Sequence, residues 1–196
     1  MGKAVAISTY DVDKIFKICG TCIGKPDKNG VAREMLQWIK IEIRNENFIA
    51  YGCDSVRIAM VSGKTIGTDT EKEFDLYVKP VRIAKKTQCV TFVLNDDKST
   101  EIFDGESKTV FEPPLVENFI DYKSVWNNQK AKQPLKVCIN AAQFAEILNQ
   151  IKGGRKADNR VLLTFDIDNT EKPILIQPLK DENQEFILCT LRNPQK

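Results

Sequence analysis

The chain has 196 residues, of which 42% are hydrophobic and 29% are charged, and its formal net charge is +2. These proportions are typical of a globular protein and exclude a largely disordered chain. The sequence contains no histidine. Ser-His-Asp and Cys-His catalysis and the commonest metal ligand are therefore absent, and composition alone argues against an enzyme.

Targeting and redox features point to a cytoplasmic protein. The apolar run at residues 4–7 is too short for a signal peptide, and no apolar stretch of about 18 residues occurs that would predict a membrane span. The six cysteines fall mostly inside apolar runs, as buried free thiols do in a reducing compartment. We expect neither a disulfide framework nor contact with a membrane.

The first predicted unit is a strand, a helix and three strands. Ser8 or Thr9 can cap a helix that ends near Gly20, and residues 4–7 form the strand before it. The helix is indicated by apolar residues at helical spacing, namely Val12, Ile15, Phe16 and Cys19. Three strands are predicted over residues 35–43, 48–53 and 56–61, with a tight turn at residues 45–47.

A similar order of elements is predicted near the C-terminus. A strand at residues 135–139 precedes Asn140 and Gln143, which resemble a capping box. The helix that follows is indicated by Phe144, Ile147, Leu148 and Ile151, and it ends at Gly153-Gly154. Strands follow at 161–167, 173–177 and 185–191. Residues 5–61 and 135–191 are each 57 residues long, so the βαβββ order is an internal duplication of architecture.

The middle of the chain is predicted to be a third unit that has lost its helix. Strands are expected at residues 73–81, 90–94, 100–104 and 108–111, and a helix could form only at residues 82–88. Residues 112–133 contain Pro113-Pro114 and end in a lysine-rich stretch, which makes them the best linker candidate.

Four stretches resemble the bacterial DNA polymerase III beta subunit, the sliding clamp. AYGCDSVRIA (50–59) resembles that family's A-T-D-G-x-R-L-A strand pair, and LVENFIDYKSV (115–125) resembles its L-x-x-G-x-F-P-D-Y-x-x-V linker. KPILIQP (172–178) matches its K-P-V-L-I-R-P strand, and FILCTLR (186–192) resembles the closing Y-L-I-M-P-M-R. The pattern departs at Asn118 and Ile120, where the family has Gly and Pro, and at the end, where Met-Pro-Met is replaced by Cys-Thr-Leu.

The resemblance implies an α+β protein with the DNA clamp fold: repeated βαβββ units, antiparallel sheets and helices on one face. Residues 1–125 resemble the family's middle domain, and residues 126–196 resemble the second half of its last domain. The family's groove for short hydrophobic peptides of polymerases and clamp loaders would here use Cys53, Ser55, Val56, Arg57, Ile58, Ile120, Ser124, Val125, Cys189, Leu191 and Arg192. Without the resemblance, most of the apolar members would be interpreted as ordinary strand core.

Basic residues are concentrated in one segment. Residues 123–160 hold eight basic residues against two acidic ones, in a chain whose net charge is only +2. Such a segment favours contact with a polyanion, although many lysine runs are only solvated surface. Since the family's helices face DNA, we expect sequence-independent contacts to duplex DNA from Lys14, Lys17, Lys152, Arg155 and Lys156.

The resulting hypothesis is a non-enzymatic, homo-oligomeric clamp that binds DNA without sequence preference, tethers replication proteins and needs no cofactor or metal. The alternative is a clamp-fold interaction module or regulator that does not encircle DNA.

Three short motifs suggest other chemistry, but each is better explained as a structural element. Asp166 and Asp168 resemble a phosphatase D-x-D motif, but only 28 residues follow Asp168, so we expect a strand-to-turn element. Residues 20–26 fail as a phosphate-binding loop because they follow a helix. Cys19 and Cys22 have redox or zinc spacing but lie at a helix C-terminus, where the dipole disfavours a thiolate.

Overall fold

The chain divides into two compact units, Met1–Ser124 and Val125–Lys196. The computed structural model describes residues 2–24, 34–54, 57–68, 73–84, 86–114, 121, 137–151, 160–166, 168–169, 171–179 and 186–191. No helix in these ranges is both long and apolar enough to span a membrane.

The first unit begins with the strand and helix that the sequence predicts. Strand β1 (Lys3–Ser8) leads into helix α1 (Thr9–Ile18), and the Ser8 hydroxyl accepts a hydrogen bond from the Asp11 N–H at 3.1 Å. This N-cap satisfies one of the donors that the first helical turn leaves free. The α-helix ends at Ile18, near the predicted end at Gly20, and a 3-10 helix, η1 (Cys19–Cys22), continues it.

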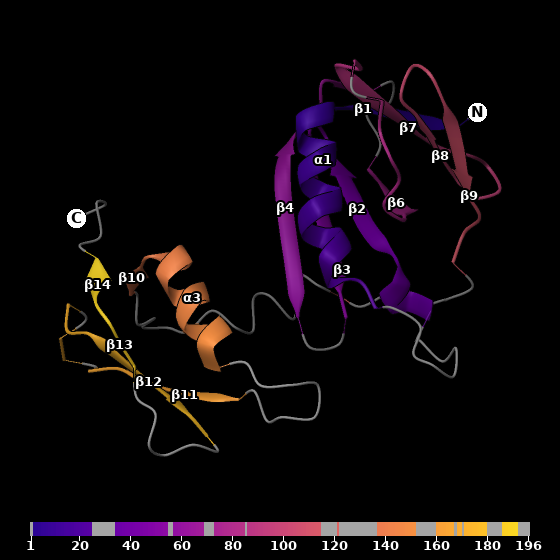
Figure 1. Cartoon of the computed structure of the whole chain (residues 1–196). Coiled ribbons are helices and arrows are strands. Elements are labelled where there is room, and N and C mark those ends of the chain that lie inside the picture. The colour runs from indigo at the N-terminus through magenta and orange to yellow at the C-terminus, as the bar shows by residue number, and fades with distance from the viewer. Residues whose placement is uncertain are drawn as a thin grey trace. The chain divides into compact units, whose positions relative to one another are not determined.

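Two antiparallel sheets form the body of the first unit (Figure 1). Their orders are β5-β1-β7-β8-β9 and β4-β3-β2-β6, and α1 lies across the second. The strands are β2 (Ile39–Arg44), β3 (Asn47–Cys53), β4 (Ile58–Lys64), β5 (Gly67–Thr68), β6 (Phe74–Val78), β7 (Cys89–Leu94), β8 (Thr100–Phe103) and β9 (Lys108–Phe111).

The two halves of this unit exchange their first strands. The first half runs from β1 to β5 and the second from β6 to β9. Strand β1 pairs with β7 of the second half along its whole length, and β6 pairs with β2 of the first half. The predicted βαβββ unit and the eroded third unit are therefore two halves of one domain, joined at two strand edges.

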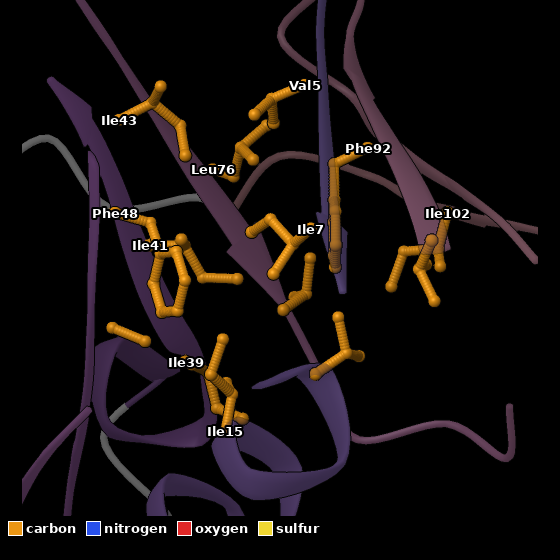
Figure 2. Close-up of a cluster of buried hydrophobic side chains, with 14 of the residues drawn as sticks. Val5, Ile7, Ile15, Ile39, Ile41, Ile43, Phe48, Leu76, Phe92 and Ile102 are labelled. Carbon is orange, nitrogen blue, oxygen red and sulfur yellow. The ribbon is translucent and has the colours of Figure 1, made fainter. Parts of the chain in front are cut away.

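A single apolar core lies between the sheets and α1. Ile39, Ile41 and Ile43 alternate along β2 and are fully buried, as are Phe92 on β7 and Ile15 on α1. Figure 2 shows these side chains pointing toward one another from both sheets. The period-2 pattern at residues 39–43 thus identifies the inner face of β2 correctly.

One predicted element of this unit differs from the structure. Residues Glu34–Gln37 form a 3-10 helix, η2, instead of the start of a strand. Residues 82–84 and 86–88 form no helix, in agreement with the prediction that this part of the chain has lost its helix.

Asp104 joins the backbone at Ala84 to the turn before β9. Its buried carboxylate accepts hydrogen bonds from the Ala84 N–H at 2.9 Å and from the Ser107 N–H at 2.7 Å. The backbone donors of Ser107, Ala84 and Glu106 lower the Asp104 pKa to about 2. The ionised carboxylate is therefore stabilised by the fold.

The second unit repeats the first half of the first unit at smaller size. It contains β10 (Cys138–Ile139), α3 (Ala141–Ile151), β11 (Val161–Thr164), β12 (Ile174–Pro178), β13 (Phe186–Leu188) and β14 (Thr190–Leu191). The Asn140 side chain caps α3 by accepting from the Ala142 and Gln143 N–H groups at 3.0 and 3.2 Å. Among its described residues, Ile174, Ile176 and Leu188 form the buried core.

The predicted strand at 185–191 is two strands. β13 pairs with β12, whereas β14 pairs with β10, so the chain passes from one sheet to another at Cys189. The predicted strand at 161–167 ends at Thr164, where the Asp166 turn begins. Gly153 and Gly154 lie outside the described residues.

Candidate peptide-binding and DNA-facing surfaces

The strand pair that most resembles the clamp family forms a tight corner in the first unit. Between β3 and β4, the Asp54 carboxylate accepts from the Arg57 backbone N–H at 2.8 Å and from its Nε at 2.9 Å. The Arg57 guanidinium also donates to the Thr21 carbonyl of η1 at 3.1 Å. The side chain of Arg57 is 61% exposed, so it is held in one orientation while it faces solvent.

Gly52 allows the end of α1 to approach this corner. A Cβ atom at position 52 would lie 2.2 Å from the Cys19 carbonyl oxygen, so no other residue fits without a backbone shift. The resulting contact places η1, and with it Thr21, against β3. The orientation of Arg57 therefore depends on a glycine five residues earlier.

An apolar patch lies beside the corner, on the face of the sheet that points away from the core. We call it the outer patch; its buried members are Leu36, Tyr51 and Cys53, and its half-buried members are Met35, Ile49 and Ile58. Cys53 and Ile58 were predicted for the peptide groove. Cys53 is only 4% exposed and forms the floor of the patch, whereas Ile58 is accessible at its surface.

Sequence reasoning missed Met35 and Leu36. The alternating pattern of residues 39–43 predicts a strand that starts at residue 35. In the structure, Met35 and Leu36 instead belong to η2 and cover the outer face of β3. The available signal was the loss of alternation at Trp38-Ile39, both of which are buried.

A partly buried ion-pair network borders the outer patch. Lys40 Nζ lies 2.8 Å from Glu42 and 3.0 Å from Asp75, and Arg44 lies 2.8 Å from Asp75. Burial disfavours the charged form of Lys40, but the hydrogen bonds to Glu42 and Asp75 outweigh it and raise the pKa of Lys40. These cations are neutralised locally.

Tyr51 lies beside this ion-pair network. It lies directly opposite Lys40 in the sheet register. Burial raises the pKa of Tyr51, and the carboxylates of Glu42 and Asp121 add to the rise. Asp121 is the one residue described within the stretch that resembles the family's linker.

Helix α1 exposes one stripe that contains both predicted DNA-facing lysines. Lys14 and Lys17 are exposed on the side opposite Val12 and Ile15. The same stripe carries Asp13 and Tyr10, whose side chain is 77% exposed. The stripe therefore has a small net positive charge and one aromatic group, which the sequence analysis did not single out.

The described part of α3 carries no lysine or arginine, and its one charged residue is Glu146. The predicted DNA-facing residues Lys152, Arg155 and Lys156 lie just beyond α3, outside the described residues. Their contact with DNA stays a prediction.

The second unit's groove residues are only partly described. Cys189 is exposed between β13 and β14, and Leu191 pairs through its backbone with Cys138 of β10. Ser55, Val56, Ile120, Ser124, Val125 and Arg192 lie outside the described residues. Because Cys53, Arg57 and Ile58 belong to the first unit, a groove shared with Cys189 and Leu191 is a proposal about how the units come together.

The remaining motifs have structural roles. The Asp166 carboxylate accepts from the Asp168 and Asn169 N–H groups at 3.0 and 3.2 Å, which makes the D-x-D stretch a turn. Burial raises the pKa of the Cys19 thiol to about 12, which disfavours a thiolate. Within the described ranges, no cluster of three or more acidic or cysteine side chains forms a metal site.

Comparison with known proteins identifies the fold. No protein-family model and no curated protein matches the chain. Among solved structures, the sliding clamp of Pseudomonas aeruginosa matches with a TM-score of 0.72 and 16% identity, over 97% of this chain and 52% of that one. A putative DNA polymerase III beta subunit from Eubacterium rectale matches with a TM-score of 0.71 and 10% identity, over 95% and 50%. The Helicobacter pylori beta clamp, solved with a DNA ligase peptide, matches with a TM-score of 0.53 and 13% identity, over 88% of this chain and 46% of that one.

The chain therefore has the DNA clamp fold, as its resemblance to the beta subunit predicted. It spans about half the length of the solved clamps that it matches. At these identities the comparison establishes the fold, and the activity has to be argued from the surfaces described above.

Proposed function

We propose that this chain is a non-enzymatic, sliding-clamp-like tethering protein of the cytoplasm that captures short hydrophobic peptides of replication proteins and binds duplex DNA without sequence preference. The observation that carries the proposal is the Asp54–Arg57 corner beside the outer patch, within a clamp fold. A fixed, exposed guanidinium next to half-buried aliphatic side chains suits an extended peptide with aliphatic anchors and a polar end. The Helicobacter pylori clamp, which shares the fold, was solved bound to a DNA ligase peptide.

Peptide capture is tested by fluorescence anisotropy with a labelled short peptide that carries two aliphatic anchors. We expect Ile58→Ala to weaken binding by roughly 1–3 kcal/mol if Ile58 lines an anchor pocket. The matched control is Ile66→Ala, because Ile66 is 60% exposed in the turn between β4 and β5 and lies outside the outer patch. Equal affinities of the two variants would contradict the outer patch as the docking surface.

The contribution of the second unit is tested at Leu191. Its backbone pairs with Cys138, so Leu191→Ala keeps the β10–β14 pairing that a truncation would remove. We expect this variant to weaken the same peptide by roughly 1–3 kcal/mol if the groove draws on both units. An unchanged affinity would confine the groove to the first unit.

DNA binding is tested by the dependence of affinity on salt. If Lys14 and Lys17 both contact phosphates, replacing both with Gln lowers the slope of log affinity against log salt by about 2. Neutralising Lys152, Arg155 and Lys156 together lowers it by about 2–3 if all three contact phosphates. Lys64→Gln, on β4, is the control and leaves the slope unchanged.

A second candidate function, a clamp-fold interaction module that does not encircle DNA, is favoured by the described part of α3. That helix carries Glu146 and no cation, although the helices of a clamp face DNA. Such a module would retain peptide capture, and its slight affinity for DNA would not change when the four named lysines and Arg155 are neutralised.

A further inference from the structure

The second unit matches the first half of the first unit element by element. β10, α3, β11, β12, β13 and β14 follow the order of β1, α1, β2, β3, β4 and β5. The correspondence extends to pairing: β1 pairs with β5, and β10 pairs with β14. Each final short strand therefore returns to the first strand of its own half.

In the first unit, two further strand edges join this half to its counterpart. The other edge of β1 pairs with β7, and the outer edge of β2 pairs with β6. The corresponding edges in the second unit are the other edge of β10 and the outer edge of β11. Among the described residues, neither edge has a partner strand.

The open edge of β11 presents backbone groups that can pair. Val161 lies opposite Pro178, which has no N–H, and the Leu179 N–H donates to the Arg160 carbonyl at 3.1 Å. In an antiparallel pair the bonded residues alternate. Leu162 and Thr164 therefore pair with β12, and the N–H and C=O groups of Val161 and Leu163 point outward.

Apolar side chains accompany these open edges. Leu163 lies opposite the fully buried Ile176, so it is on the core face of the sheet, yet it is 36% exposed. Phe165, next in the alternation, is 39% exposed. No described residue of α3 is fully buried, whereas Val12 and Ile15 of α1 are. The core of the second unit is thus half of a clamp-domain core.

We propose that this half is completed by the second unit of another copy of the same chain. β10 of each copy pairs with β11 of the other about a twofold axis. The resulting strand order, β14-β10 followed by β11-β12-β13 of the second copy, equals the order β5-β1-β7-β8-β9 of the first unit. One interface is thereby repeated twice, as twofold symmetry requires.

The open edges of the second unit and the apolar side chains beside them can form an interface of this kind. A stable protein–protein interface buries about 800 Å² per partner. Two strand edges, the half-buried apolar residues Phe144, Ile147 and Ile151 of α3, and the exposed Leu163 and Phe165 are available from each chain. Strand pairing alone is weak, but pairing that also closes a core is stable. The association requires neither DNA nor peptide, so its test is independent of the proposed function.

The first test is the mass of the full-length chain by sedimentation at micromolar concentration. We expect an assembly of at least twice the chain mass of 22.2 kDa. Leu163→Lys places a charge beside the open edge and is expected to raise the dissociation constant at least about tenfold. Ile187→Lys is the matched control, because Ile187 is 69% exposed on the opposite face of β13, and it leaves the mass unchanged.

The second test identifies the strands by disulfide trapping. Val137 and Ile139 pack on the core, so Cys138 between them points away from it, as the 50% exposed Leu162 does on β11. The Cα atoms of directly opposite residues in an antiparallel pair lie about 4.5–5.5 Å apart, which a disulfide can span. Leu162→Cys is therefore expected to form an oxidised dimer in which position 162 is linked to Cys138 of the other copy.

Cys138→Ser in the Leu162→Cys background separates this arrangement from the alternatives. Loss of the trapped dimer supports pairing of β10 with β11. Persistence of the dimer means that the disulfide joins other positions, such as position 162 of both copies or the exposed Cys189, and this overturns the proposal. A monomeric wild-type chain overturns it as well.

Discussion

Gly52→Ala tests whether the packing of α1 against β3 sets both the stability of the first unit and the position of Arg57. The added Cβ would lie 2.2, 2.8 and 3.0 Å from the carbonyl oxygen, carbonyl carbon and Cα of Cys19. These are backbone atoms, so no side chain can rotate away. The end of α1 and η1 must instead move away from the sheet.

Overpacking of this kind costs typically 1–3 kcal/mol, and a contact with backbone lies at the upper end. We expect Gly52→Ala to lower the free energy of unfolding by about 3 kcal/mol in urea denaturation. Gly67→Ala is the matched control, because nothing lies within 4 Å of a Cβ there, and we expect a change within about 0.5 kcal/mol.

The same variant links stability to the candidate site. Thr21, which accepts a hydrogen bond from Arg57, lies on the segment that must move. Without urea, where the Gly52→Ala variant is still folded, we therefore expect its affinity for the peptide to be lower than that of the wild type. If Gly52→Ala were as stable as the wild type, the close approach of Cys19 to Gly52 would be refuted. If the variant were destabilised but bound the peptide with wild-type affinity, the link between this packing and the position of Arg57 would be refuted.

Two further predictions concern the first unit. Asp104 has a folded pKa of about 2 against an ordinary value of 3.8, so its contribution to stability is present above about pH 4 and is lost as the pH falls toward 2. The stability advantage of the wild type over Asp104→Asn should therefore be seen in melts at pH 6 and should shrink between pH 4 and pH 2; a pH-independent difference would contradict the carboxylate's role. Phe92→Ala should cost about 3–5 kcal/mol because Phe92 is fully buried, whereas Phe103→Ala, at a side chain that is 48% exposed, should cost far less, and similar urea midpoints for both would contradict the core assignment.

The sequence predicted those elements whose pattern is local. Ser8, the spacing of Val12 and Ile15, and the alternation at Ile39, Ile41 and Ile43 each depend on neighbours within one helix turn or one strand. The order βαβββ followed from them, and the four motif stretches then indicated the clamp fold, which the structure confirms.

Other features depend on contacts between distant residues, which a single sequence does not show. Asp104 accepts a hydrogen bond from the Ala84 N–H although it lies twenty positions later in the sequence. β13 and β14 separate because their partners lie in different sheets. The outer patch was half predicted: the motif identified Cys53 and Ile58, but Leu36 joins them from η2, which was expected to be a strand.

The placement of the charges decides which measurement distinguishes the two candidate functions. Lys40 and Arg44 lie beside the outer patch, but Glu42 and Asp75 neutralise them, so they contribute fixed geometry and little long-range field. Among the described residues, no ion pair involves Lys14 or Lys17, but Asp13 on the same stripe reduces their field. Since the described part of α3 adds no cation, strong attraction to DNA would have to come from the basic residues just beyond α3. A salt slope that responds to Lys152, Arg155 and Lys156 therefore supports a clamp on DNA, and a slope that does not respond supports the interaction module.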